Sequence, residues 1–488
     1  VGGALLLAGL VWAGPAFGLA PALGRASSST LAAGGAAQRP PQLRQRVELR
    51  ALEGLVEVAG AAEAAQAWGL FDTSLLASFA DQAGNINGVL FQASLLPYLA
   101  FLYFLGYKGN NTPPLVQYGF AFLLLFVIAT IPTGLISKGT YGLILADSDW
   151  LHGTAESLLT CTNILLVLGF RGALQGDVQV ADSPVMKNVS YGWLAAVVLA
   201  IAAGIPLLGF EAHTPFLGGL GALTPENVAD GMMTASGIPF IGFEAVAEPV
   251  NALSLPTWIV HWSTVFEWLL AMSLAWRYAE VSGNEKWKGL AWGMIPSHIS
   301  SCAALTFHVF YNQIPWILTA QAAFTFIGNS TLAFATYRIA SSSGWELSDL
   351  NPFKEKVAEV EPAPVEEEVK EPSFSFFGFG AKEPEKLAPP PPAVPESEKP
   401  YFEVAKLRPL PEGELISGPL LAAEVVLLTV FMSYATKYGE LLIASGLWSS
   451  TDLTASFVAF LFVFVPPVLV ANTMYSQSSD LQQRFAKS

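Results

Sequence analysis

Residues 115–137 read LVQYGFAFLLLFVIATIPTGLIS, a stretch without a single charged side chain. A helix of this length rises about 35 Å, which is enough to cross the roughly 30 Å hydrocarbon core of a bilayer. The whole chain has the same character, because 52% of its 488 residues are hydrophobic and only 13% are charged. A soluble domain could not bury so much apolar surface, so the sequence predicts an all-α polytopic membrane protein.

Hydropathy predicts about nine transmembrane helices. They lie near residues 88–107, 115–137, 150–170, 189–210, 256–278, 288–309, 315–337, 416–436 and 452–474. Membrane lipids are therefore the expected surroundings. The net charge of −15 argues against nucleic acid as a partner, because phosphates attract basic surfaces. The two cysteines are too few for a disulfide framework or a Cys-rich zinc or iron–sulfur site.

The N-terminal region has the composition of a targeting segment. Residues 1–20 are apolar and end in small residues, and an acid-free stretch rich in Ser and Ala follows. We expect residues 1–80 to be a presequence and a poorly ordered N-terminus, with a tenth membrane span as the alternative for the apolar part. The string AGPAFGLAP at 13–21 resembles the two-part plastid presequence of algae with secondary red plastids, which implies import into a plastid.

Charge and proline concentrate in one internal segment. Residues 341–415 hold 16 of the 39 acidic residues and 13 of the 33 prolines. Such a composition cannot bury enough apolar area to offset chain entropy, so it predicts a disordered linker over 342–415. A C-terminal two-helix membrane hairpin, 416–488, follows it. The aromatic cluster Phe374–Phe379 inside the linker is a chance cluster, a membrane-surface segment or a short docking motif.

The loops differ in charge between the two sides of the membrane. One side carries Lys108, Arg171, Lys187, Arg277, Lys286, Lys288 and Arg338. The longest loop on the other side, 211–255, has five acidic residues and no Lys or Arg. Basic loops stay on the side from which a protein inserts. We therefore expect the linker and the C-terminus to be stromal and the loop 211–255 to be lumenal.

Two groups of three spans share short strings. Ile131–Ser137 reads IPTGLIS and Ile295–Ser301 reads IPSHISS, while Trp150 and Asn163 recur as Trp316 and Asn329. The offsets of 164 and 166 residues predict a tandem three-helix repeat, with modules at 86–172 and 253–341. The fourth span and the acidic loop, 173–252, separate them and leave both copies in the same orientation.

The second module resembles a known membrane family. Its strings are LPTWIVHW at 255–262, IPSH at 295–298 and FTFIGNST at 324–331, and they resemble the hypothetical chloroplast reading frame forty-nine family. The first module, with WLHGTAE at 150–156 and Asn163, resembles a companion uncharacterised family of cyanobacteria and plastids. The resemblance implies a plastid, photosynthetic setting and assigns no reaction.

Polar side chains inside the spans are costly and each needs a reason. His152, Glu156, Thr160 and Asn163 recur on one face of the third span, where His152 and Glu156 can hydrogen-bond each other. The fifth span carries one histidine and the sixth carries two. The candidate cofactor-binding residues are therefore His152, Glu156, His261, His298 and His308.

Three interpretations of these residues stay open. They are helix–helix packing contacts, axial ligands of chlorophyll, or a metal or proton site. For the last, His152 with Glu156 and His298 with His308 are the candidate pairs. The Glu-x-x-His pairs of diiron bundles and the HExxH motif are missing from the sequence, so no metal is expected.

The sequence also lacks GxSxG and the glycine patterns of nucleotide-binding folds, so we expect no enzyme activity. Our preferred interpretation is a non-catalytic thylakoid protein that acts as an accessory subunit or assembly factor of a photosynthetic complex. Chlorophyll and carotenoid are its candidate cofactors, and photosystem I or its antenna is its candidate partner. The alternative is a small-molecule or ion transporter of a plastid membrane.

Overall fold

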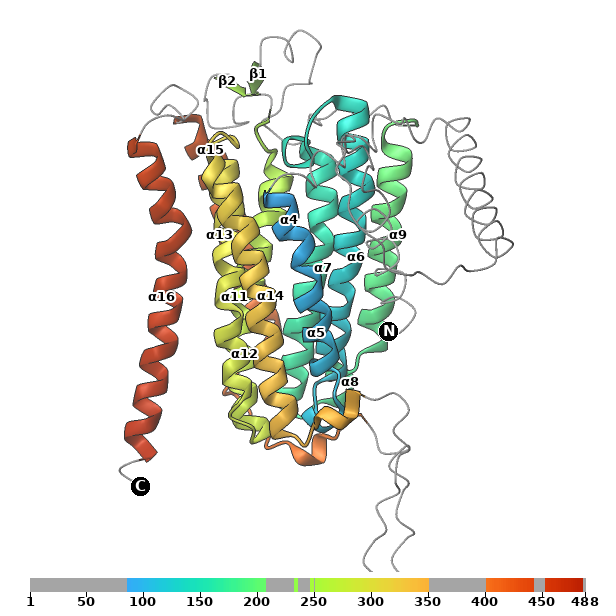
Figure 1. The fold of residues 1–488 in the computed structure, drawn as a ribbon, viewed down its shortest axis with the longest axis vertical. Helices are drawn as coiled ribbons and strands as arrows, with labels where there is room; N and C mark the ends of the chain where they lie inside the picture. Colours follow the sequence, from blue (N-terminus) through green and yellow to red (C-terminus); the bar gives the residue numbers. More distant parts are fainter. Residues whose placement is uncertain are drawn as a thin grey trace, which may run out of the picture.

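The computed structural model describes residues 86–207, 232–235, 246–249, 251–350, 401–442 and 453–485. The predicted presequence, the aromatic cluster Phe374–Phe379 and most of the acidic loop lie outside these residues. The described part is a bundle of roughly aligned helices (Figure 1). This confirms the predicted all-α membrane fold.

Helices occupy all nine predicted regions. They are α4 (Ile86–Ala93) with α5 (Leu95–Leu105), α6 (Pro114–Ile136), α7 (Asp149–Gln175), α9 (Pro184–Gly204), α11 (Leu255–Ser282), α12 (Trp287–Gly293) with α13 (Ile295–Val309), α14 (Pro315–Ser342), α15 (Gly418–Leu442) and α16 (Leu453–Phe485). Short elements join them, among them α8 (Val178–Ala181) and the antiparallel strands β1 (Met232–Ala235) and β2 (Val246–Pro249).

Seven of the described helices are long and apolar enough to cross a membrane by themselves. The other two predicted spans differ for a physical reason. Helix α11 is 28 residues long, but it carries Glu267 and two further charged residues. Helix α13 has only 15 residues, because the helix is interrupted at Met294, just before Pro296. These two helices also carry the buried histidines His261, His298 and His308. Their polar side chains therefore lie inside the bundle and not against lipid.

The two modules pack reciprocally. Helix α7 of the first module contacts α11 of the second, and α14 of the second contacts α5 of the first. The repeated asparagines make the same bond at each interface: Asn163 Nδ2 donates to the carbonyl of Thr264 at 3.0 Å, and Asn329 Nδ2 donates to that of Ser94 at 3.0 Å. Equivalent side chains thus bind equivalent helices, which supports the tandem parallel repeat.

The bundle has a loop end, near β1 and β2 in Figure 1, and a linker end, near residues 343–350 and 401–417. Aromatic rings fill its core toward the linker end. Phe101 meets Phe120 at 4.8 Å between ring centroids, and Tyr278 meets Trp287 at 4.9 Å. These rings and Phe170 are almost fully buried, so this half of the bundle is closed by close packing.

Residues 401–417, which we call the strap, lie across the linker end. The backbone N–H of Arg408 donates to Val281 O at 2.8 Å, and that of Leu410 donates to Leu174 O at 2.9 Å. Val281 and Leu174 lie at the C-terminal ends of α11 and α7, where helix carbonyls lack partners of their own. The prediction of a disordered linker over 342–415 is therefore wrong for residues 401–415, because backbone bonds that composition does not reveal hold them in place. Residues 351–400 of the predicted linker lie outside the described residues.

Side chains strengthen this attachment. Leu407 is buried, and the Asn111 side chain both donates to and accepts from the backbone of Glu403. The hydroxyl of Tyr401 donates to Leu105 O at 3.3 Å, and burial raises the pKa of this hydroxyl above its usual range, so it remains a neutral donor. The strap thus contacts both modules at the linker end.

Candidate metal centre

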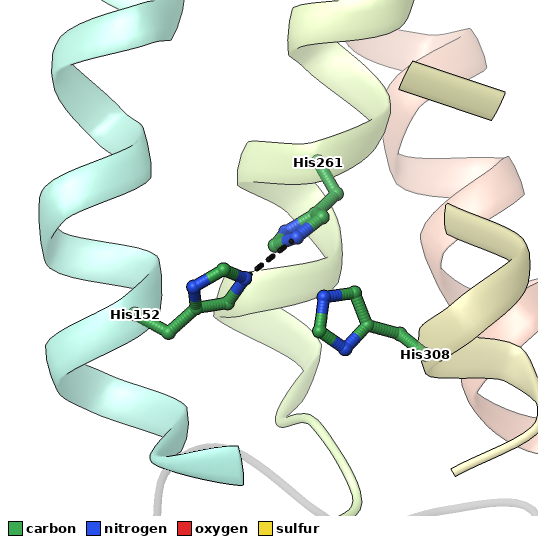
Figure 2. A group of neighbouring side chains, drawn as sticks. All are labelled: His152, His261 and His308. Atoms are coloured by element: carbon green, nitrogen blue, oxygen red, sulfur yellow. Dashed lines mark hydrogen bonds between the residues drawn. The ribbon is translucent and has the colours of Figure 1, made fainter. Parts of the chain in front are cut away.

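Three of the five predicted site residues come together at the loop end of the bundle. His152 of α7, His261 of α11 and His308 of α13 face one another (Figure 2). The other two do not join them. The ring of His298 lies by the Sγ of Cys302 at 3.9 Å. Glu156 lies one helical turn after His152 on α7, but the His152 ring hydrogen-bonds His261. The prediction that His152 and Glu156 hydrogen-bond each other is therefore wrong.

Helix direction explains how residues so far apart in sequence meet. Helices α7 and α11 begin at the loop end, so His152 and His261 lie in their first two turns. Helix α13 runs the opposite way and places His308 in its last turn. The three side chains therefore arrive at one level of the bundle from three helices and from both modules.

The geometry of the cluster is compact and regular. Each pair of rings has a centroid separation of 5.0 Å. The Nε2 atoms of His152 and His261 are 3.1 Å apart, and one nitrogen from each of the three residues lies within 4.8 Å of the others. In a tetrahedral site with metal–nitrogen bonds of about 2.0–2.1 Å, ligand atoms are about 3.3 Å apart. The pair of Nε2 atoms is close to that spacing.

The other ring nitrogen of His261 is held in the way metal-binding histidines require. Its Nδ1–H donates to the carbonyl of Thr257 at 2.8 Å. This bond fixes the tautomer, so the lone pair of His261 Nε2 faces His152 and accepts a hydrogen bond from its Nε2–H at 3.1 Å. An ion at this position would replace the proton that the two Nε2 atoms share. Only 7% of His261 and 5% of His308 are exposed, whereas His152 is half-buried, so two of the three ligands are largely screened from solvent.

A close approach of two helices sets the distance between His152 and His261. Gly153 follows His152 on α7, and a Cβ at this position would lie 2.6 Å from Thr257 Oγ1 on α11. Thr257 Oγ1 in turn donates to the carbonyl of Asp149 at 3.3 Å, and Asp149 Oδ1 accepts from the backbone N–H of Ser254 at 2.8 Å. The first turns of α7 and α11 are thus locked together beside the cluster.

Sequence reasoning did not single out Gly153, Thr257 or Asp149. A glycine beside a candidate histidine is a weak signal, because most helical glycines have no such role. Asp149 at the start of α7 and Ser254 directly before α11 were a usable signal, since both residue types favour helix N-termini. Their pairing across the two modules could not be seen in the sequence.

Below the histidines the polar side chains do act as packing contacts. Thr160 Oγ1 shares hydrogen bonds with Ser263 Oγ at 3.2 Å and Thr264 Oγ1 at 3.0 Å, and Asn163 binds the same turn. Glu267 differs, because its Oε2 is buried with no hydrogen-bond partner among the described residues. The packing interpretation therefore fits this layer better than it fits the histidines.

The repeat provides an internal control for the histidines. At the offset of 166 that relates Asn163 to Asn329, His152 corresponds to Leu318 and Glu156 to Ala322. The second interface, between α14 and α5, therefore packs without a histidine at this position. Packing alone does not require His152, whereas the asparagine contact occurs in both copies.

The fold and the cluster define a polytopic helical membrane protein with three histidines converging at one end of its bundle. Residues 252–338 match a family described as a protein of unknown function, DUF2499, and residues 87–175 match a second family so described, DUF3593. The chain belongs to the Ycf49 family, an uncharacterised family of plastid and cyanobacterial proteins, as the relatives below show. This confirms the resemblance noted in the sequence.

Two relatives carry this assignment. A Ycf49-like protein of Synechocystis sp. (strain ATCC 27184 / PCC 6803 / Kazusa) is 48% identical over 96 residues, which cover 92% of that protein and 19% of this chain. An uncharacterized protein ycf49 of Cyanophora paradoxa is 33% identical over 88 residues, covering 86% of it and 18% of this chain. No solved structure matches the chain.

Proposed function

We propose that this protein binds a transition-metal ion through His152, His261 and His308. The observation that carries the proposal is the convergence of three imidazoles, from three helices, with their ligand atoms within 4.8 Å of one another. An all-nitrogen set of this kind suits zinc, copper(II), iron(II) or nickel. The sequence did not predict it, because the three residues share no spacing motif.

The geometry favours an ion over a pigment at this cluster. A chlorophyll magnesium takes one axial ligand and needs room for a flat macrocycle beside it. Here each imidazole has another imidazole at 5.0 Å, and Trp258 lies 6.4 Å from His308 and 6.1 Å from His261 between ring centroids. The space between the rings suits an atom, and pigment ligation remains a separate proposal for His298.

Three protein ligands leave one position of a tetrahedral ion for water or a small ligand. Structural zinc sites are usually closed by four protein ligands, so a three-histidine site is of the open kind. When bound, the ion would supply Lewis acidity at that position. We propose metal binding as the function and assign no catalytic step to it.

We further infer that the protein works in the thylakoid membrane, as an accessory subunit or assembly factor of a photosynthetic complex. The relatives in a cyanobacterium and in Cyanophora support this setting. The surface supports it as well. Only 11% of the most apolar part of each of the spans formed by α9 and α15 is buried against the rest of the chain, so the remainder is available to lipid or a partner. By the distribution of Lys and Arg, the metal site lies at the lumenal end.

An ion transporter is the rival function, and the packing counts against it. Among the described residues, the side-chain hydrogen bonds between α7 and α11 extend no further below the histidines than Asn163. The aromatic core of Phe120, Phe170, Tyr278 and Trp287 follows with almost no exposed surface. A conducting path would have to cross this core. The arrangement supports a protein that holds its ion at one end.

The test is metal analysis of the full-length protein purified in detergent, with cobalt(II) as a coloured probe of tetrahedral sites. We expect one ion per chain, and we expect His152→Gln, His261→Gln and His308→Gln each to weaken binding at least 100-fold. His298→Gln is the matched control and should leave metal binding unchanged. Folded protein that takes up no zinc, cobalt or copper at micromolar concentrations would overturn the proposal.

The same preparation tests the pigment interpretation. If the purified protein carries chlorophyll, and His152→Gln shifts its absorption while metal content is unaffected, the cluster is a pigment site. If any pigment survives all three substitutions and responds only to His298→Gln, the metal proposal stands beside a separate pigment site.

A further inference from the structure

Asp147 links the three chain segments that carry the histidines. Its Oδ1 accepts a hydrogen bond from Asn312 Nδ2 at 2.7 Å and another from Asn251 Nδ2 at 3.3 Å. Asp147 precedes His152 by five residues, and Asn312 follows His308 by four. Asn251 lies in the segment that leads into α11, which carries the third histidine.

Further bonds make this connection a closed network, which we call the latch. Asn312 Nδ2 also donates to the carbonyl of Ala146 at 3.2 Å, and Asn251 Nδ2 donates to that of Tyr311 at 2.6 Å. The Tyr311 hydroxyl donates to the carbonyl of Glu440 in α15 at 3.0 Å. The latch therefore joins the loops before α7 and α11 to the turn after α13.

The turn after α13 is held in an unusual conformation. Tyr311 and Asn312 have φ angles of 49° and 60°, so two consecutive residues other than glycine lie in the left-handed region. Asn tolerates this region, but a bulky residue such as Tyr rarely adopts it. Such a conformation persists only where the surroundings impose it, and it tends to occur at functional sites. Here the latch imposes it next to His308.

The turn also places Asn312 four residues after His308. Asn312 lies next to the His308 ring. The Oδ1 of Asn312 and the Nδ1 of His308 are both buried, and neither has a hydrogen-bond partner among the described residues. Because Asp147 holds the Nδ2 of Asn312, its Oδ1 is left to accept from Nδ1–H after a small rotation. Metal-binding histidines generally have such an acceptor.

We propose, on the basis of the metal site above, that Asp147 is the positioning residue of that site. It acts through Asn312 on His308 and, through the shared loops, on the other two ligands. Asp147 and His152 lie within the matched residues 87–175, whereas His261, His308 and Asn312 lie within 252–338. The latch therefore completes, across the junction of the two modules, a site for which neither module has all three ligands.

The test compares Asp147→Asn with wild type in the full-length protein. Asn has the size of Asp and keeps an Oδ1 that can accept from both asparagines. The substitution therefore removes the negative charge that makes these hydrogen bonds strong. Substituting an outer partner of a metal ligand typically weakens metal binding about 10- to 100-fold. We expect a loss of this size for cobalt(II) and zinc, measured by competition with a chelator, while one ion per chain is still bound at saturation.

Two controls separate positioning from general stability. Asp182→Asn removes an acidic side chain that pairs with Lys187 away from the cluster, and it should not change the metal affinity. The double variant Asp147→Asn with Asn312→Asp exchanges donor and acceptor, so its affinity should recover toward wild type. A purely structural Asp147 would lower the melting temperature without changing the affinity of the folded protein.

The outcomes distinguish this inference from the one it rests on. If wild type binds no metal, the proposed function fails and the inference fails with it. If wild type binds one ion and Asp147→Asn binds it equally well, only the positioning role of Asp147 is wrong. Loss in Asp147→Asn without recovery in the double variant would also refute transmission through Asn312.

Discussion

Gly153→Ala should weaken metal binding without touching a ligand. The added Cβ would lie 2.6 Å from Thr257 Oγ1 and 3.2 Å from Thr257 Cβ and Cγ2, whereas ordinary contacts between such atoms are about 3.5–4.0 Å. Either α7 and α11 separate by about 0.5–1 Å, or Thr257 rotates and loses its hydrogen bond to the carbonyl of Asp149. Both responses disturb the pair His152–His261.

The magnitude follows from the tolerance of metal sites. Ligand distances must hold to about ±0.2 Å, so a separation several times larger breaks the geometry. Overpacking of this kind typically costs about 1–3 kcal/mol, which corresponds to about a 5- to 150-fold loss of affinity if it is relieved by opening the site. The assay is competition between the purified protein and a chelator for cobalt(II), read from the visible spectrum.

A matched glycine provides the control. Gly192 lies in α9, where an added Cβ would meet nothing within 4 Å. Gly192→Ala should therefore leave the affinity unchanged and, through better helix propensity, keep or slightly raise the melting temperature. Combining Gly153→Ala with Thr257→Ala removes the nearest clashing atom and should restore part of the affinity. Unchanged affinity in Gly153→Ala, or an equal loss in Gly192→Ala, would refute the reasoning.

Three further predictions concern the fold. Asn163→Ala and Asn329→Ala should each destabilise the protein by a similar amount, about 1 kcal/mol, in thermal unfolding, with no change in metal affinity; very unequal losses would argue against the reciprocal packing. Leu407→Asp should release the strap and make it a site of limited proteolysis, whereas wild type should resist there. Protease added from the stromal side of intact thylakoids should cut within 351–400 and spare 211–245, and the opposite pattern would reverse the orientation.

Composition and local pattern were sufficient for the class of protein and its plan. Long apolar runs determine where helices form, because a bilayer admits only segments that satisfy their own backbone hydrogen bonds. The recurrence of IPTGLIS as IPSHISS, and of Trp150 and Asn163 as Trp316 and Asn329, predicted two modules. Both asparagines bind the facing helix. Composition gave a wrong prediction for the strap, which it assigned to a disordered linker. The strap is ordered because its backbone N–H groups donate to carbonyls at the C-terminal ends of α7 and α11.

For the candidate site, too, the sequence determined one part and the tertiary structure the other. The sequence alone marked His152, His261 and His308 as candidates, because an imidazole inside a membrane span is costly and rare. It paired His152 with Glu156, since residues four apart on a helix share a face. Only the tertiary structure decided that His152 instead meets His261, 109 residues away, and His308. Periodicity describes one helix at a time, whereas the level at which separate helices face each other depends on their direction, their close approach at Gly153 and the loops that join them.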